Sequence, residues 1–139
     1  MAAQGKPQKG TTPGTRFRAV AECRRKDMDA LLEKKRFDAA VYLGGYAIEC
    51  YLKYLITRSQ NIPKLPADFE THVLDDLAAA AFTPDEWDSI TRTNKAFERI
   101  IDEWGPSMRY QANAIPAAKA KEFCTLIDLV YNQMKELKP

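Results

Sequence analysis

The sequence lacks the residues from which most metal and nucleophile sites are built. Its 139 residues include one histidine, His72, and three cysteines, Cys23, Cys50 and Cys124, which lie far apart and form no Cys-x-x-Cys pair. No two of these residues have the spacing of zinc ligands. An odd number of scattered cysteines favours a reducing compartment over a disulfide framework. We therefore predict a cytoplasmic protein without a metal or other cofactor.

Phosphate-binding glycine motifs and membrane-spanning runs are also missing. Neither Gly-x-x-x-x-Gly-Lys-Ser/Thr nor Gly-x-Gly-x-x-Gly occurs. The most apolar stretch, residues 41–56, is shorter than the roughly 20 residues that cross a bilayer, and it carries Glu49 and Lys53. The amino terminus lacks the apolar core of a signal peptide. We therefore predict no membrane association.

The net charge of +2 gives no whole-molecule argument for nucleic acid, but the charges are unevenly distributed. Residues 16–36 hold eight Lys or Arg against four acids, a balance of +4, whereas residues 71–104 hold three against eight, a balance of −5. Such polarity could steer an anionic ligand or align two subunits. The alternative is that both segments are ordinary solvated faces.

Apolar residues recur at intervals of three and four, and no segment alternates with period two, which predicts helices rather than strands. Residues 1–14, rich in Gly, Pro, Thr and Lys, predict a disordered tail. We expect long helices at residues 15–35, 38–59, 84–104 and 116–137, a short helix at 72–81, and loops at 61–69 and 105–114. The prediction is one all-α domain over residues 15–139, an antiparallel up-and-down helical bundle of four long helices and one short helix.

Two adjacent glycines, Gly44 and Gly45, interrupt the most apolar of these helices. Each costs a helix interior about 1 kcal/mol relative to alanine, so we expect another backbone segment to lie unusually close. Because this helix has so few charges, it should be buried on most sides at the centre of the bundle. Asp38 lies at its start and is expected to cap it.

The helix predicted at residues 84–104 has the clearest start in the chain. Thr83 at the N-cap, Pro84 at the first position and Glu86 at the third are typical of a capping box. The acids around it therefore have a structural explanation in the helix dipole. On the inner face of the helix, Asn94 interrupts an apolar seam, which predicts a role in fixing packing register or oligomeric state.

Glu49 and Lys53 lie four residues apart, so they share one face of the apolar helix. A buried carboxylate needs a cation or several donors, and Arg109 is a second candidate partner for Glu49. A structural ion pair and a ligand site both remain open. Arg109 and Tyr110 also have two alternative roles, one in ligand binding and one in the structure. They can hold a phosphate and stack on a base, or Tyr110 can pack on the core while Arg109 neutralises Glu49.

Four segments, taken in order, resemble the HEPN family of small helical-bundle proteins. They are YLGGYAIECYLKYLI (residues 42–56), similar to that family's second long helix; His72-Val73-Leu74 with Leu77, similar to a His-x-Leu-x-x-Leu short helix; Trp104 followed by Met108-Arg109-Tyr110, similar to an Arg-Tyr pair before the last helix; and an Ala- and Lys-rich final helix. The resemblance covers roughly residues 16–137. It implies an antiparallel bundle, frequent homodimerisation, association with nucleotides or RNA, and pairing with a nucleotidyltransferase or an antitoxin.

Some HEPN proteins are metal-independent ribonucleases that use an arginine followed four to six residues later by a histidine. The chain departs from this pattern, because thirteen residues separate His72 from the nearest preceding arginine, Arg58. Histidine is the side chain best suited to transfer protons at neutral pH, so the activity cannot be carried over from the motif.

Our leading hypothesis is a non-catalytic, HEPN-like homodimer that binds a nucleotide, RNA or a partner protein. We expect Arg109 and Tyr110 to bind the ligand, with His72, Glu49 and Lys53 as second candidates, and we expect the glycine-bearing helix or the last helix at the dimer contact. One alternative is a ribonuclease toxin with a non-standard site such as His72 with Arg109. The other is a purely structural dimerisation module.

Overall fold

The computed structural model describes residues 12–138, and every regular element in that range is a helix. The elements are α1 (Gly14–Glu33), α2 (Phe37–Ser59), η2 (Ala67–Phe69), α3 (Leu74–Ala81), α4 (Pro84–Arg92), α5 (Ala96–Glu103), η3 (Pro106–Tyr110) and α6 (Ala117–Leu137), where η marks a short 3-10 helix. The predicted all-α class is confirmed. None of the helices in this range combines the length and the apolar character needed to cross a bilayer.

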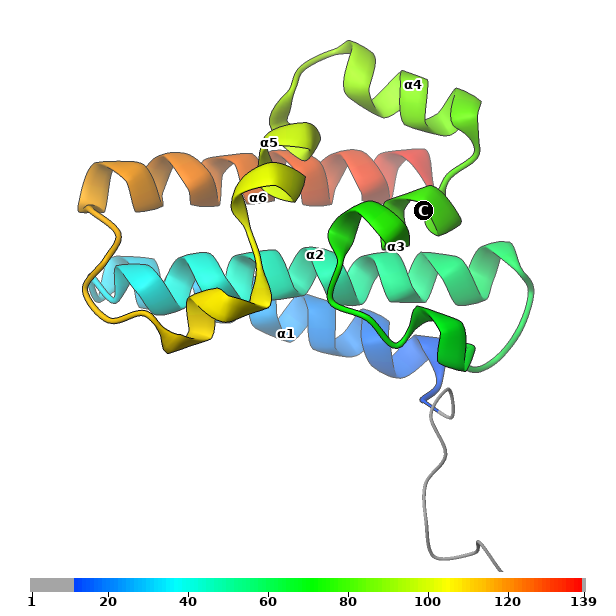
Figure 1. Ribbon diagram of the computed structural model, residues 1–139, viewed down its shortest axis with the longest axis horizontal. Coiled ribbons are helices and arrows are strands. Elements are labelled where there is room, and N and C mark those ends of the chain that lie inside the picture. Colours follow the sequence, from blue (N-terminus) through cyan, green and yellow to red (C-terminus); the bar gives the residue numbers. More distant parts are fainter. Residues whose placement is uncertain (1–11, 139) are drawn as a thin grey trace, which may run out of the picture.

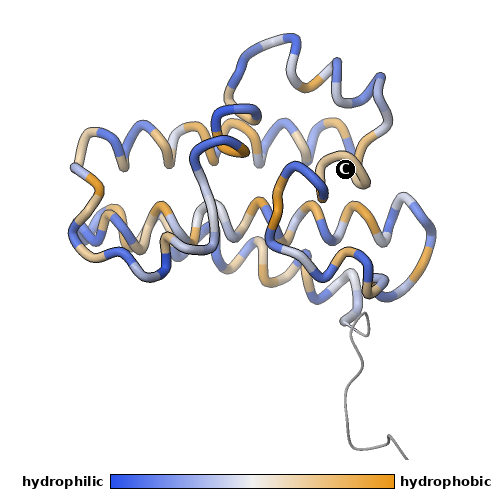
Figure 2. Tube along the Cα trace, viewed as in Figure 1, coloured by the Kyte–Doolittle hydropathy of each residue, from blue (hydrophilic) through white to orange (hydrophobic). Residues whose placement is uncertain are grey.

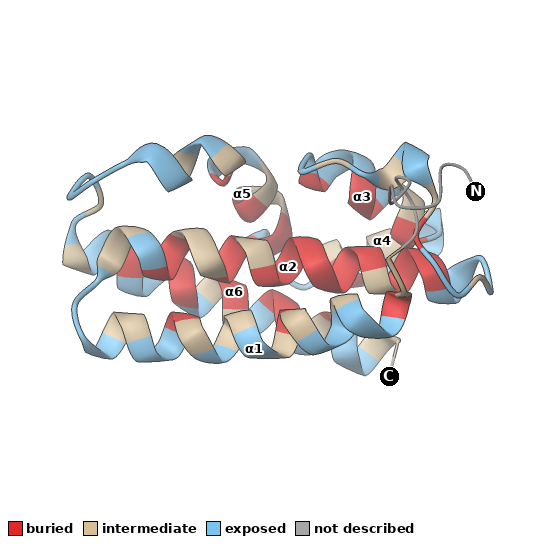
Figure 3. Cartoon of the chain, turned by 90° about the horizontal axis from the view of Figure 1, so that it is seen from below, coloured by how far each residue is buried: buried red, intermediate tan, exposed pale blue. Residues whose placement is uncertain are grey.

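Helix α2 is the centre of the molecule, as its sequence predicted. It packs against α1, α6, α3 and η3, and Figure 1 shows these elements around it. Fourteen of its 23 residues are buried, which Figure 3 shows as red along most of the helix. Because so many faces of α2 are covered, its apolar side chains form the core to which the other helices contribute.

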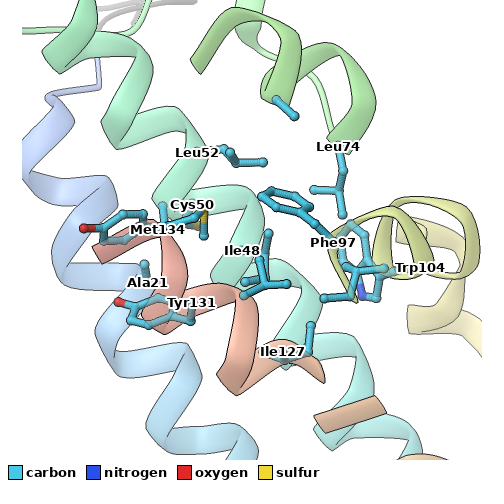
Figure 4. Packing of buried hydrophobic residues seen from close by; sticks show 14 of the residues in the cluster. Ala21, Ile48, Cys50, Leu52, Leu74, Phe97, Trp104, Ile127, Tyr131 and Met134 are labelled. Atoms are coloured by element: carbon cyan, nitrogen blue, oxygen red, sulfur yellow. The ribbon is translucent and has the colours of Figure 1, made fainter. Parts of the chain in front are cut away.

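The buried core joins the three long helices to α5. Ile48 and Leu52 of α2 are fully buried, together with Ala21 of α1 and Met134 of α6. Figure 4 shows Phe97 of α5 pointing into the same cluster. Burying a large aliphatic or aromatic side chain contributes about 1.5–3 kcal/mol, so this cluster supplies much of the driving force for folding.

The fourth long helix of the prediction is broken at residues 93–95 into α4 and α5. The side chain of Asn94 causes the break, since its Oδ1 accepts a hydrogen bond of 2.9 Å from the backbone N–H of Ala96 at the start of α5. Asparagine favours such local bonds over a helix interior. The predicted placement of Asn94 on the apolar seam of one continuous helix is therefore wrong. The predicted capping box is confirmed, with Thr83 and Glu86 exchanging bonds of 2.9 and 3.1 Å.

The break leaves three long helices, α1, α2 and α6, where four were predicted. Asp38, near the start of α2, contacts Ala114 just before α6, and Tyr51, further along α2, packs on Tyr131, further along α6. Helices α2 and α6 therefore run in the same direction (Figure 1), as the second and fourth helices of an up-and-down bundle do. Three short helices, rather than one full-length helix, bring the chain back to the end where α2 begins. Figure 2 shows that α4, the outermost of them, is mostly hydrophilic.

The two glycines of α2 are sites of close approach, but to side chains rather than to another backbone. A Cβ atom at Gly45 would lie 2.1 Å from Nε1 of the Trp104 indole, and one at Gly44 would lie 2.5 Å from the sulfur of Met28. The indole is held in place because Nε1 donates a hydrogen bond of 3.2 Å to the carbonyl of Tyr42. The expectation that another backbone lies close to the glycines is therefore wrong. The expectation that a neighbouring segment leaves no room for a side chain at these positions is confirmed.

Both ends of α2 are tied to distant segments. Of the predicted tail, residues 1–11 lie outside the described residues. The backbone N–H of Gly14 donates to the carbonyl of Pro63 at 2.9 Å, so residues 12–14 are attached to the loop after α2 and are not part of a tail. Asp38 does not cap α2. Its carboxylate accepts hydrogen bonds of 2.9 and 3.0 Å from the backbone N–H groups of Ala114 and Ile115, and so fixes the connection to α6.

Candidate functional site

Glu49 is a buried carboxylate in the middle of α2, with a side chain only 1% exposed. Its Oε2 accepts a hydrogen bond of 3.0 Å from the ammonium of Lys53, one helical turn further on. The predicted pair is therefore confirmed. A buried charge is tolerated only when it is paired and hydrogen-bonded, and a second partner for Glu49 comes from outside the helix.

That second partner is His72, in the segment before α3. Its Nδ1 lies 2.9 Å from Oε2 and 3.1 Å from Oε1 of Glu49. Because a carboxylate only accepts hydrogen bonds, Nδ1 carries the proton, and the neutral ring then has its lone pair on Nε2. The side chain of His72 is 52% exposed. A ring that is oriented by a buried carboxylate and open to solvent can donate or accept a proton through Nε2.

Lys53 is the third member of this cluster, and it is buried. Its side chain is 7% exposed, and its ammonium lies 5.6 Å from the centre of the Phe17 ring of α1. The lysine is thus enclosed by a carboxylate and an aromatic face, where it neutralises Glu49. This position gives Lys53 a structural role, whereas His72 is the member of the cluster that solvent reaches.

Arg109 and Tyr110 form the second cluster, at the end of η3. The guanidinium carbon of Arg109 lies 4.9 Å from the centre of the Tyr110 ring, a cation–π contact. Tyr110 is 78% exposed. Hydrogen bonding to Tyr110 and to Tyr42 raises the pKa of Arg109 above its usual value, so the guanidinium stays charged. The pair therefore presents an aromatic face and a permanent positive charge to solvent.

The two clusters lie along one face of α2. Arg109 meets the helix at Tyr42, and His72 meets it at Glu49. These two positions are seven residues apart, which is two turns or about 10 Å along the axis. The hypothesised pairing of Arg109 with Glu49 is wrong, because η3 lies over the start of α2 and Glu49 is bound by Lys53 and His72. The packing of Tyr110 on the core is wrong too, given its exposure.

Sequence reasoning missed two tyrosines that connect the clusters. The rings of Tyr42 and Tyr46 stack with centroids 6.4 Å apart, and Tyr42 also stacks on Trp104 at 5.9 Å. Both tyrosines are half-buried. Tyr42, Tyr46, Glu49 and Lys53 follow one another at intervals of four, three and four residues. This spacing, read together with the resemblance at Arg109, could have placed them on one face.

The two buried cysteines, Cys50 and Cys124, are poor nucleophiles. Burial, with a smaller contribution from the charge of Glu49, raises the pKa of the Cys50 thiol to about 12. Burial likewise raises the pKa of Cys124 to about 12. Thiols with such pKa values are not thiolates at neutral pH and are inert. Among residues 12–138 no group of three His, Cys, Asp or Glu side chains is placed to hold a metal ion.

Comparisons with models of protein families, with curated proteins and with solved structures gave no match.

Proposed function

We propose that this protein is a non-catalytic, HEPN-like bundle that binds single-stranded RNA or a nucleotide through Arg109 and Tyr110. The observation that carries the proposal is the exposed Tyr110 ring with the Arg109 guanidinium 4.9 Å from its centre. The sequence resemblance to the HEPN family supports the same ligand class. It also supports the finer expectation of a bundle that acts beside a nucleotidyltransferase or an antitoxin.

The chemistry of the pair fits a nucleotide. Stacking a base on an aromatic side chain contributes about 1–3 kcal/mol and tolerates any base. A guanidinium can bind two phosphate oxygens at once and keeps its charge at every physiological pH. Neither interaction requires a metal ion. An exposed tyrosine beside an arginine can therefore hold both the base and the phosphate of one nucleotide.

Titration calorimetry with AMP, ATP and an eight-nucleotide RNA tests the proposal. We expect heat of binding for the parent protein and an affinity about 5- to 150-fold lower for Tyr110→Ala, the equivalent of the stacking energy given above. Val73→Ala serves as the control, since Val73 is another exposed apolar residue and lies outside the cluster. Equal affinities for Tyr110→Ala and the parent would reject the site. No heat with any of the three ligands would favour the structural dimerisation module.

We further propose that the protein is a homodimer with α6 at the contact. Helix α2 is enclosed by its own chain, whereas α6 exposes Leu129 on its outer face. Sedimentation at micromolar concentration should show a dimer, and Leu129→Glu should shift it toward monomer by placing a charge in an apolar contact. A parent protein that sediments only as a monomer would contradict this proposal.

The Glu49–His72 pair favours one second candidate, a metal-independent ribonuclease with a non-standard site. His72 is oriented by a buried carboxylate at 2.9 Å, as a residue that transfers protons would be. Incubating the protein with total RNA in EDTA tests this function. Cleavage that disappears in His72→Ala and persists in Tyr110→Ala would favour the ribonuclease, whereas intact RNA would leave the binding protein as the proposed function.

A further inference from the structure

Six basic side chains gather at the end of the bundle where η3 lies. They come from the turn between α1 and α2, from η3 and from the start of α6: Lys34, Lys35, Arg36, Arg109, Lys119 and Lys121. Figure 1 shows these three segments at the same end of the molecule. None of the six forms an ion pair with another side chain in the described part of the chain. Residues 105–121 contain no acid at all.

Most of the acids near these cations are engaged elsewhere, and the exception is Glu33, which lies next to Lys34 and has no ion pair within residues 12–138. Asp38 accepts two backbone hydrogen bonds from the connection to α6. Glu103 and Glu122 both bind Arg99, at 3.1 and 3.2 Å. Asp29 lies 3.5 Å from Arg25. Because six cations face only one unengaged acid, Glu33, positive charge at this end of the bundle is left for a partner from solution.

Three grooves connect four of the six cations, Lys35, Arg36, Lys119 and Lys121, along one continuous surface. A groove of about 820 Å³ is lined by Lys119 and Gln111 and reaches η3 at Met108. A second groove, of about 510 Å³, shares Gln111 with the first and is lined by Arg36 and Lys35. A third, of about 630 Å³, shares Lys35 and reaches Lys121. The surface therefore runs from the residues beside Tyr110 around the end of the bundle.

We infer that these grooves hold the phosphate backbone of a single-stranded RNA whose base stacks on Tyr110, so that the ligand is an oligonucleotide rather than a mononucleotide. The inference rests on the proposed function of Arg109 and Tyr110 and specifies its ligand. A row of unpaired cations along a groove is the arrangement that follows a nucleic-acid backbone. Amides such as Gln111 and Asn113 add donors for phosphate oxygens.

Binding of AMP and of a labelled eight-nucleotide RNA to the full chain, measured at several salt concentrations, tests this inference. The test variant carries Arg36→Gln and Lys119→Gln, which remove one charge from each of two grooves. The control carries Arg16→Gln and Lys26→Gln, two exposed residues of α1 that line none of the three grooves, and has the same net charge. Each phosphate contact to a single strand contributes about 0.7 to the slope of log K against log salt.

For the test variant we expect a slope smaller by about 1.4 and an octamer affinity about 25-fold lower at 0.1 M salt. Its affinity for AMP should match that of the parent and the control. An octamer affinity no lower than that of the control would overturn the inference and leave the proposed function intact. Equal competition by an oligoglutamate of the same charge would overturn it in favour of an acidic peptide. If Tyr110→Ala binds AMP and octamer like the parent, the proposed function fails instead.

Discussion

Replacing Glu49 with alanine is expected to lower the free energy of unfolding by about 3–5 kcal/mol, because the change leaves a charged lysine buried without its partner. Lys53 is 7% exposed and depends on Glu49 for its hydrogen bond of 3.0 Å. The cost arises from the isolated ammonium more than from the lost contact. Urea denaturation followed by far-ultraviolet circular dichroism measures the difference directly.

The double variant Glu49→Leu, Lys53→Met separates the cost of an unpaired buried charge from the loss of the ion pair itself. Apolar residues of similar size often replace a buried ion pair without loss, so this variant should regain most of the stability that Glu49→Ala loses. His72→Ala should have little effect on stability, since the imidazole is half-exposed and Lys53 still neutralises Glu49. A Glu49→Ala protein as stable as the parent would mean that the carboxylate does not hold this part of the core together.

The Gly45→Ala variant is expected to be less stable than the parent by about 2–3 kcal/mol. Its new Cβ would overlap the Trp104 indole at 2.1 Å, and penalties for overpacking a core outweigh the gain of about 1 kcal/mol in helix propensity. The indole cannot easily move, because it stacks on Tyr42 and donates a hydrogen bond to the backbone of α2. Thermal and urea unfolding of the purified variant measure the loss.

Two other glycines provide graded controls for this prediction. Gly44→Ala should be better tolerated, since the clash at 2.5 Å is with the sulfur of the flexible Met28 side chain. Gly105→Ala should be neutral, because no atom lies within 4 Å of its new Cβ. If all three variants unfold at the same urea concentration as the parent, close packing at Gly45 is not a determinant of this fold.

Local sequence signals predicted the parts of the fold that depend on neighbours in the chain. The helical periodicity, the capping box at Thr83 and the central position of α2 all follow from residues within one or two turns of each other. The break at Asn94 was missed because the apolar spacing continues across it, from Ile90 to Phe97, as if the helix were intact.

The site shows the same division between local and long-range signals. Glu49 and Lys53 are four residues apart, so their pairing could be read from helix geometry alone. His72 lies 23 residues from Glu49, and Trp104 lies 62 residues from the Tyr42 carbonyl that it contacts. No rule of spacing reaches across such distances. These contacts are set by how α3 and η3 pack on α2, which only the tertiary structure reveals.

Photo-crosslinking to an RNA octamer that contains 4-thiouridine locates the bound strand on the chain and so shows whether RNA binds at Tyr110. Mass spectrometry of the digested complex should find the adduct on the peptide that carries Tyr110, and Tyr110→Ala should greatly reduce its yield. Adducts confined to the basic helix α1, or an absence of adducts at concentrations that saturate binding, would mean that RNA does not bind at Tyr110.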